Sequence, residues 1–594
     1  MIQNLPKEFP IGKLDDLDFG GAEAKTDTLI ETPLGVCWTR PIHEFVKGKK
    51  NIVIGERGVG KSVLFKLLSE EKIKIKKKKD EHHAILLIEE ELQYGTLKDY
   101  VDKHVQTFLT DPSMKYRIVW ELFILSRILA FVTKKYAAFL PEELHKANEE
   151  MSVVLGYKTD SLKLSEIVKG VKATVGLKFG SSPIGTIESS VYTSLEPKEG
   201  LATDSKSVVG EKNIDIDEYK KLVQQFLDQR NTFLFVLVDK VDEFVVKSDY
   251  DIQQLMLQAL METEKSYMDC KNIRFKLFIR CDLYKRLEYD VIGPDKITAK
   301  KITLVWTDED IRMFIAQRIM HNYFNVLGLN SLQFSIDDDK LYVDEKSVDN
   351  YIPDQSHDPS VSIPFVSVLV RSFSRFWKRE MPKERKRHIE GRHTTMNDEI
   401  SKQIITSIFP KHVKHIDKNG QSKQIDIFEY FSTHFSLASG TTTPRLLVMF
   451  LDKCLVIARE YYRNNPDEKV LLDMSGEYQL FKRNILKIAY AEFQTEISES
   501  FSMISSHWKN YFERFVEKKG KRTEYSFEVL YKFLGGDREE MRGFLAFMCH
   551  IGYLKCHNTK ALIEDRQYTL PILFQSDNKR HGTDGLTHAT YMQR

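Results

Sequence analysis

Hydrophobic and polar residues follow two distinct patterns along the first half of the chain. Short apolar runs predict four buried strands, at 51–55, 84–90, 232–239 and 274–282. Between these runs, apolar residues recur at helical spacing and predict helices at 61–68, 116–140, 217–229 and 252–265. Because strands that alternate with helices form a parallel sheet covered by helices on both faces, we expect an α/β fold built on a largely parallel sheet.

The second half of the chain has a different pattern. From residue 308 strands nearly vanish, and helical periodicity dominates up to about residue 464. A long helix is predicted at 477–498, followed by two shorter helical stretches and a small hairpin, which is the order of a winged-helix domain. Polar residues at about 150–213 predict a hairpin and loops inserted into the α/β core.

These patterns divide the chain into five segments. They are an N-terminal approach segment at 1–47, an α/β core at 48–305, an α-helical lid domain at 306–464, a winged-helix domain at 465–575 and a flexible tail at 576–594.

The composition is that of an ordinary globular protein. The 594 residues exceed what one compact core accommodates, and 42% of them are hydrophobic and 29% charged. A formal net charge of +2 gives no whole-molecule field for nucleic acid or a membrane surface. Any such partner would therefore need a local patch.

Cysteines and apolar runs indicate the compartment. Six cysteines are too few for a disulfide framework, which favours a reducing environment. The first residues lack the apolar core of a signal peptide. The best apolar run, 120–132, is too short to span a bilayer and is interrupted by Glu121 and Arg127. We expect a cytoplasmic protein with no membrane partner.

Residues 55–62, GERGVGKS, match the phosphate-binding pattern GxxxxGK[ST] and lie between a predicted strand and a predicted helix. In this context glycines allow successive backbone N–H groups to curl around an anion, and the helix N-terminus adds its dipole. Lys61 would neutralise the β- and γ-phosphates, and Ser62 would bind Mg²⁺. The candidate phosphate-binding residues are Gly55, Gly58, Val59, Gly60, Lys61, Ser62 and Val63.

A phosphate site also needs a carboxylate at the end of an apolar strand, and Asp239 ends the run 232–239. We expect Asp239 to hold the Mg²⁺ shell together with Ser62. Of the acids that follow, Glu243 is the first candidate for the base that orients or deprotonates the attacking water, and Asp242 is the second. The alternative for these two acids is a solvated helix N-terminus.

Residues 239–242, DKVD, also resemble the guanine-recognition turn NKxD of GTPases, with Asp in place of Asn. That interpretation requires a DxxG turn between the phosphate-binding loop and Asp239. None is present in residues 63–238, which favours an adenine nucleotide.

Two arginines are candidates for contact with the γ-phosphate. Arg280 falls at the carboxyl end of a predicted strand, where ligands of open α/β folds bind, although an ion pair with Asp282 is the alternative. Arg445 would project from the first turn of a helix whose predicted N-cap is Thr443, with Pro444 at its first position. A purely structural turn is the alternative there.

The order of these motifs resembles a known arrangement. GERGVGKS, VLVDKVDEF, LFIRCD, WTDEDIRMFIAQRI, TTTPR and the predicted winged helix resemble additional-strand P-loop ATPases of the AAA+ and STAND type, including NACHT-like and KAP-like proteins. The likeness extends over roughly residues 15–575 and is greatest to an uncharacterised bacterial P-loop ATPase family with a C-terminal winged helix. It implies ATP and Mg²⁺ as ligands and a sheet of strand order 5-1-4-3-2.

The resemblance also implies roles for individual residues. Lys61 and Ser62 would belong to Walker A, Asp239 to Walker B, and Arg280 and Arg445 would be sensors 1 and 2. Members of these groups act as oligomeric switches or assembly ATPases, frequently with an effector protein and in antiviral defence. We therefore expect a homo-oligomeric, slowly hydrolysing ATPase with an effector partner.

One departure from the AAA+ pattern concerns turnover. AAA+ motors usually place the catalytic acid directly after the Walker B aspartate, and this chain has Lys240 there. The spacing is closer to the NACHT branch, which implies slow hydrolysis. An arginine finger from a neighbouring subunit cannot be assigned, because Arg312 and Arg318 are weak candidates and a solvated helix face is the stronger interpretation of both.

Two alternatives remain for function. One is a non-hydrolysing scaffold that only holds nucleotide. The other is a DNA-binding AAA+ ATPase resembling origin-recognition loaders, in which the basic and aromatic segment 371–393 would contact nucleic acid by charge neutralisation and stacking. The predicted reading helix of the winged segment offers Arg538 and Arg542 beside Glu539 and Glu540, and this near-neutral face favours packing or partner docking over DNA reading.

Overall fold

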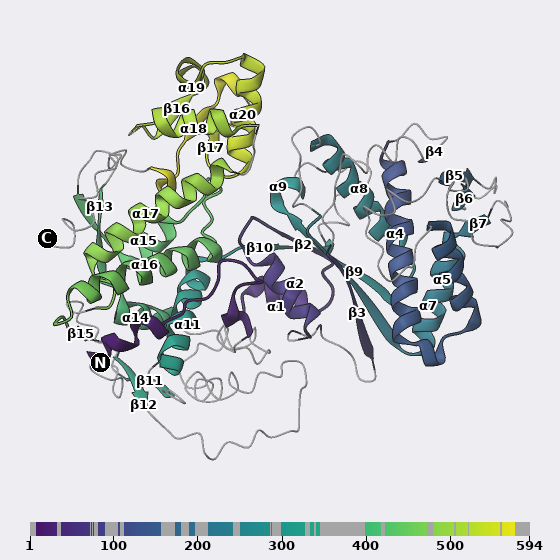
Figure 1. The fold of residues 1–594 in the computed structure, drawn as a ribbon, viewed down its shortest axis with the longest axis horizontal. Helices are drawn as coiled ribbons and strands as arrows, with labels where there is room; N and C mark the ends of the chain where they lie inside the picture. Colours follow the sequence, from purple (N-terminus) through teal and green to yellow (C-terminus); the bar gives the residue numbers. More distant parts are fainter. Residues whose placement is uncertain are drawn as a thin grey trace, which may run out of the picture. The chain divides into compact units, whose positions relative to one another are not determined.

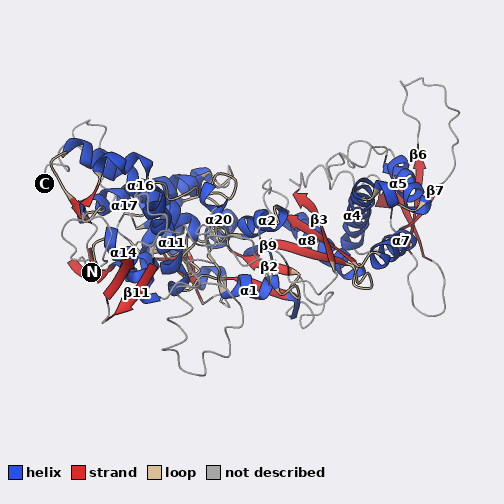
Figure 2. Ribbon diagram, turned by 90° about the horizontal axis from the view of Figure 1, so that it is seen from below, coloured by secondary structure: helices blue, strands red, loops and turns tan. Residues whose placement is uncertain are grey.

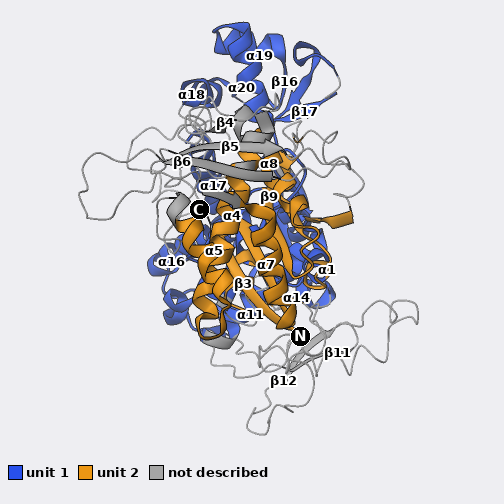
Figure 3. Cartoon of the chain, turned by 90° about the vertical axis from the view of Figure 1, so that its right-hand side faces the viewer, with its two compact units in different colours: residues 1–43, 57–63, 305–594 blue, residues 44–56, 64–304 orange. Residues whose placement is uncertain are grey.

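The computed structural model divides into two compact units, shown in Figure 3. Unit 1 comprises residues 1–43, 57–63 and 305–594, and unit 2 comprises residues 44–56 and 64–304. The structure describes residues 8–31, 37–71, 73, 75, 81–89, 105–106, 112–155, 173–179, 189–195, 212–241, 250–284, 287, 299–326, 333–337, 340–344, 398–416, 422–471, 479–503, 507–520, 522–558 and 561–575.

Unit 2 is built on a five-stranded sheet in which every pair of neighbours is parallel. The strands are β2 (Ile52–Gly55), β3 (His82–Glu89), β8 (Thr232–Asp239), β9 (Ile273–Arg280) and β10 (Lys301–Leu304). Their order, β10-β2-β9-β8-β3, becomes 5-1-4-3-2 when these five are renumbered along the chain. This confirms the predicted parallel sheet and the strand order that the resemblance implies.

Helices lie on both faces of this sheet (Figures 1 and 2), as the alternating pattern predicts. One face packs against α4 (Pro112–Lys135), α7 (Ile216–Gln229) and α8 (Tyr250–Ser266). On the other face, Phe278 of β9 contacts Phe45 of α1 (Arg40–Val46) and Phe65 of α2 (Lys61–Ser69), with ring centroids 6.1 and 5.7 Å apart. The central strands β2, β8 and β9 are therefore buried on both sides, which explains their near-continuous apolar sequences.

The predicted insertion contributes to a second sheet in unit 2. Strands β5 (Ala173–Phe179) and β6 (Ser189–Leu195) pair antiparallel, as the predicted hairpin requires. They are flanked by β4 (Val105–Gln106) and β7 (Lys212–Asp215) in a four-stranded sheet. The remaining described elements of unit 2 are α5 (Glu142–Leu155), η3 (Ala137–Phe139) and α9 (Cys281–Tyr284).

Unit 1 is mostly helical. Its long helices are α11 (Asp308–Val326), α14 (Asp398–Ile408), α15 (Ile427–His434), α16 (Pro444–Asn464) and α17 (Arg483–Ser502). The expectation that strands nearly vanish before residue 464 is only partly right. Two antiparallel pairs lie there, β11 (Gln333–Asp337) with β12 (Lys340–Asp344) and β13 (His412–Ile416) with β14 (Ser422–Asp426).

The N-terminal residues of unit 1 pack against its helices. Strand β1 (Glu8–Phe9) pairs antiparallel with β15 (Val470–Leu471), and two 3-10 helices follow, η1 (Ile11–Asp16) and η2 (Thr28–Glu31). The guanidinium of Arg459 in α16 donates to the carbonyls of Leu14, Asp15 and Leu17 at 2.9–3.2 Å. These hydrogen bonds fasten residues 14–17 to α16.

The last described part of unit 1 is a small mixed module. Its elements are α18 (Lys509–Lys518), β16 (Glu524–Ser526), α19 (Phe527–Leu534), α20 (Arg538–His550), β17 (Lys555–His557), η5 (Ile563–Asp565), β18 (Gln567–Thr569) and η6 (Ile572–Phe574). The sheet order is β16-β18-β17, and both pairings are antiparallel. The predicted hairpin after the helices corresponds to β17 and β18, but three helices follow α17 where two were predicted, and the additional strand β16 pairs with β18.

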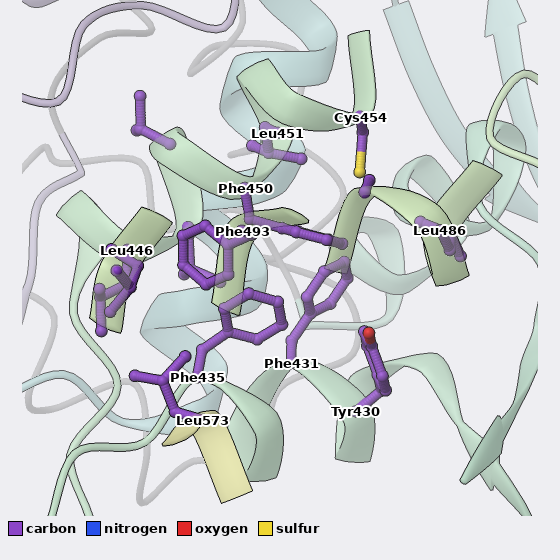
Figure 4. Close-up of a cluster of buried hydrophobic side chains, with 14 of the residues drawn as sticks. Tyr430, Phe431, Phe435, Leu446, Phe450, Leu451, Cys454, Leu486, Phe493 and Leu573 are labelled. Carbon is purple, nitrogen blue, oxygen red and sulfur yellow. The ribbon is translucent and has the colours of Figure 1, made fainter. Parts of the chain in front are cut away.

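An aromatic core joins α15, α16 and α17 (Figure 4). Phe435 lies 4.7 Å from Phe450 of α16 and 5.5 Å from Phe493 of α17, measured between ring centroids. Leu446, in the first turn of α16, belongs to the same cluster. The start of α16 is therefore held by a dense core, since each large buried side chain contributes about 1.5–3 kcal/mol. Among the described helices, none combines the length and apolarity needed to cross a bilayer.

Candidate functional site

The GERGVGKS segment forms a glycine-rich turn between a buried strand and a helix. The chain leaves β2 at Gly55 and enters the nine-residue helix α2 at Lys61. Gly58 and Gly60 have φ of +83° and +98°, a conformation that side chains with a Cβ rarely adopt. Apart from Gly60 and its two neighbours in the chain, no heavy atom of the described residues lies within 4 Å of the position that a Cβ on Gly60 would take. The strand–loop–helix context that the motif requires is therefore present.

Three of the predicted site residues lie on neighbouring strands at one edge of the unit 2 sheet. Gly55 of β2 is in register with Arg280, the last residue of β9. Asp239 is the last residue of β8, which pairs with β9, and it is buried. Because all these strands are parallel, their carboxyl ends lie at the edge where open α/β sheets bind ligands.

The backbone turns sharply after Asp239. Lys240 has φ of +63°, in the left-handed region that is uncommon for residues other than glycine, and Val241 behind it is buried. The two predicted bases, Asp242 and Glu243, lie outside the described residues, and so does segment 371–393.

In unit 1, the start of α16 lies directly against the glycine loop. A Cβ on Gly58 would be 2.9 Å from the Cβ of Arg445 and 3.2 Å from the Thr443 hydroxyl oxygen. Thr443 is the N-cap and Pro444 is in the first turn, as predicted, although no hydrogen bond from the Thr443 side chain caps the helix among the described contacts. The structure thus brings Arg445 to the glycine loop, although 387 positions of sequence separate Arg445 from Gly58.

The turn that precedes α16 is internally bonded. The hydroxyls of Ser436 and Thr442 lie 3.1 Å apart, and the Leu437 N–H donates to the Thr441 carbonyl at 3.1 Å. At its other side, the Ala438 N–H donates to the Gly552 carbonyl at 2.9 Å, in the turn between α20 and β17. The turn therefore serves a structural role as well as presenting Arg445.

Arg445 also has an acidic neighbour in the N-terminal segment. Its Nη2 lies 3.2 Å from Oε1 of Glu23, and the two side chains are 31% and 62% exposed. An ion pair this exposed is worth at most about 1 kcal/mol because water and salt screen it. Arg445 is therefore positioned by packing of its backbone and Cβ rather than by this charge pair.

Trp306 contacts the glycine loop, and the sequence patterns did not predict this contact. Its indole Nε1–H donates to the Val59 carbonyl, at the centre of the glycine loop, at 2.9 Å. The signal that was available is the sequence WTDED directly after a strand, which places Trp306 just before the start of α11.

Both interpretations of Arg318 are wrong, because it is neither a solvated side chain nor an available arginine finger. It is 3% exposed, and its two terminal nitrogens donate to the two carboxylate oxygens of Asp27 at 2.9 and 2.6 Å. Arg312 is 17% exposed and pairs with Asp398 at 2.5 Å. The pairing of Arg312 lowers the pKa of Asp398, against the opposing effect of burial.

The residues present fit a magnesium nucleotide. The loop provides glycines at positive φ and a helix N-terminus, the combination that binds phosphate. Ser62 is exposed at the start of α2, and Asp239 ends its strand, so the chain supplies a hydroxyl and a carboxylate. Oxygen ligands of this kind are those that Mg²⁺ prefers.

Comparisons with known proteins add little to this picture. No protein-family model and no curated protein matches the chain. A structure of the Aeropyrum pernix ORC2 protein, in ADPNP–ADP complexes, has a TM-score of 0.31 and 10% identity, covering 100% of this chain and 96% of that chain. A structure of the Aeropyrum pernix ORC1 protein in complex with DNA has a TM-score of 0.30 and 9% identity, covering 91% and 92%. Likeness at this level carries no argument about function.

Proposed function

We propose that this chain binds ATP with Mg²⁺ at residues 55–62 and uses slow hydrolysis as a conformational switch. The observation that carries the proposal is the backbone of the GERGVGKS segment, which leaves a parallel strand, turns through two glycines at positive φ and begins a helix at Lys61. Backbone N–H groups in such a turn converge on one point, and a helix dipole favours negative charge there.

Each site residue then has a role. Bound Mg²⁺-ATP supplies the scissile phosphoanhydride and the metal charge that offsets the phosphates. Lys61 donates to the β- and γ-phosphates, while Ser62 and Asp239 provide oxygen ligands for the metal. The arginines at the end of β9 and in the first turn of α16, Arg280 and Arg445, donate toward the γ-phosphate.

The contacts of Arg445 support a switch. The start of α16 touches Gly58 on one side, and the preceding turn is hydrogen-bonded to Gly552 of the C-terminal module on the other. A shift of Arg445 toward a γ-phosphate would therefore be transmitted to that module, which we interpret as a winged helix in a relay role.

Hydrolysis is tested by phosphate release under multiple turnover. We expect slow release that disappears in Lys61→Ala and in Glu243→Gln, while Glu243→Gln still binds ATP. Asp242→Asn identifies which of the two acids is the base, since only the base variant loses release at unchanged affinity. If wild-type protein binds ATP but releases no phosphate, the switch by hydrolysis is contradicted and the non-hydrolysing scaffold is supported instead.

We also propose that the switch is homo-oligomeric. Sedimentation of the full chain with and without ATP and Mg²⁺ tests this, with Lys61→Ala as the control that cannot respond. A nucleotide-dependent change of mass in wild type alone supports assembly, and an unchanged monomer contradicts it.

DNA binding is the second candidate function, and the observation that favours it is the basic and aromatic segment 371–393. The described part of the chain places no free basic face on α20, because Arg538 pairs with Glu528 at 2.7 Å and Arg542 pairs with Glu539 and Glu564. A steep salt dependence of DNA affinity, lost when Arg385, Lys386 and Arg387 are changed to Gln, would support this candidate. Neither the described residues nor the comparisons support a setting in antiviral defence or an effector partner.

A further inference from the structure

Residues 306–310 form a capped helix start directly after β10. The Thr307 hydroxyl donates to the Asp310 carboxylate at 2.8 Å, and the Asp310 N–H donates back to that hydroxyl at 3.1 Å. The Thr307 N–H also donates to the Asp310 carboxylate at 3.0 Å. This reciprocal arrangement is a capping box, which fixes the direction in which the chain enters a helix. The backbone of Trp306 is therefore set by its local sequence.

The Trp306 side chain is fixed as well. Its ring packs edge-on against Phe314 of α11, with centroids 5.5 Å apart and planes at 77°. Phe314 is buried in the core of unit 1, where the Arg318 guanidinium lies 4.8 Å from its ring centroid. Packing on one side leaves the indole N–H aimed at the Val59 carbonyl, 2.9 Å from the nitrogen.

The Val59 carbonyl shares its peptide plane with the Gly60 N–H. There are no cis peptides among the described residues, so in this trans unit the C=O and N–H vectors point in opposite directions. A donor that holds the carbonyl therefore fixes the direction of the Gly60 N–H, which faces away from Trp306. Apart from Gly60 and its two chain neighbours, no heavy atom of the described residues lies within 4 Å of the position of a Cβ on Gly60, and its φ of +98° is one that glycine tolerates.

We propose that Trp306 is a positioning residue for the phosphate-binding loop, holding the Val59 carbonyl outward so that the Gly60 N–H is preset to donate to a phosphate. This inference rests on the proposed function. A donor that is already oriented costs no reordering when the anion binds, so the gain falls on nucleotide affinity rather than on the chemical step.

The test compares Trp306→Phe with a matched control. Phenylalanine keeps an aromatic ring against Phe314 and removes only the N–H donor. Trp120→Phe is the control, because the Trp120 Nε1–H also donates to a backbone carbonyl, that of Met256 at 3.0 Å, within unit 2 and away from the glycine loop in sequence. Calorimetry with Mg²⁺-ATP gives the Kd of each variant, and steady-state phosphate release gives kcat and KM.

We expect Trp306→Phe to weaken ATP binding roughly three- to tenfold, the range for one hydrogen bond, and to raise KM with kcat nearly unchanged. Trp120→Phe should leave the Kd within about twofold of wild type even where it lowers Tm. A Kd for Trp306→Phe equal to that of wild type overturns the positioning role but leaves the proposed function intact. Absence of binding by wild-type protein overturns the proposed function itself.

A second variant covers the case in which Trp306→Phe does not fold. Phe314→Leu retains the indole N–H but removes the ring that holds it in place. We expect weaker ATP binding in this variant as well, by a smaller factor. An unchanged Kd for ATP in folded Phe314→Leu contradicts the role of Trp306 as a positioning residue.

Discussion

Lys276 is a fully buried lysine in β9. Its Nζ donates to the carbonyls of Gly48 and Lys50, and it lies 4.9 Å from the ring centroid of Phe45. Burial, followed by repulsion from Arg274, lowers the pKa of Lys276 from 10.5 to about 7. The ammonium form is therefore disfavoured in the folded chain relative to the unfolded chain.

This pKa gives a prediction for stability against pH. Between about pH 7 and 10.5 the unfolded chain binds a proton at Lys276 that the folded chain does not, so the free energy of unfolding rises with pH across this window. Below about pH 7 both states are protonated and the penalty, on the order of a few kcal/mol, is fully present. Urea unfolding at pH 7, 8 and 9 should show a steeper rise for wild type than for Lys276→Met. Equal slopes would contradict the assignment.

At the scale of elements, the contact between the glycine loop and α16 can be separated from backbone strain. Gly58→Ala and Gly60→Ala both place a Cβ on a residue with positive φ, which costs roughly 1–2 kcal/mol. Only at Gly58 would the new Cβ meet Arg445, at 2.9 Å, and overpacking adds about 1–3 kcal/mol. We expect a larger drop in Tm for Gly58→Ala. Equal drops would show that the start of α16 does not press on the loop.

The N-terminal segment and α11 are joined by a buried ion pair. Asp27 and Arg318 are about 4% and 3% exposed. Asp27→Ala would leave the guanidinium buried and uncompensated, and we expect a loss of about 3–5 kcal/mol in urea unfolding. Asp15, whose side chain is 67% exposed beside Arg459, is the control from the same segment. Asp15→Ala should cost at most about 1 kcal/mol, and a similar cost for both variants would contradict the role of burial.

Sequence patterns predict elements well where a single local signal decides them. The apolar runs of β2, β8 and β9 are buried on both faces, so their continuous hydrophobicity is distinctive. Strand β13, with the sequence HVKHI, alternates weakly and, among the described strands, pairs with β14 alone, which explains why a helical stretch was expected there. The position of the glycine loop between a strand and a helix could likewise be predicted from the motif spacing alone.

At the scale of the whole molecule, long-range pairing could not be predicted. Arg318 pairs with Asp27 across 291 positions of sequence, and the local sequence around either residue does not predict this pairing. Trp306 reaches Val59 across 247 positions by the same kind of tertiary closure. The position of Arg445 in the first turn of a predicted helix made it a candidate for the γ-phosphate, but no spacing rule showed that it would meet Gly58. Buried ion pairs and long-range side-chain hydrogen bonds depend on how distant elements pack, whereas hydrophobic periodicity predicts one helix or strand at a time.

Unit 1 connects the glycine loop to the C-terminal module through a short series of contacts. These run from Gly58 to Thr443 and Arg445, and from the turn before α16 to Gly552. Such a series gives a nucleotide a route to the end of the chain only if a nucleotide binds at the loop. Nucleotide binding at the glycine loop is therefore the first step of the proposed switch.

Calorimetric titration of Mg²⁺-ATP into the full chain tests this most directly, with Lys61→Ala and, as a control on the same helix, Lys66→Ala. We predict binding of one nucleotide per chain for wild type and Lys66→Ala. Affinity should be roughly 10- to 100-fold weaker for Lys61→Ala, the effect of losing a charge-assisted hydrogen bond worth about 1.5–3 kcal/mol. No heat of binding with wild-type protein, or equal affinity in Lys61→Ala, would contradict the account.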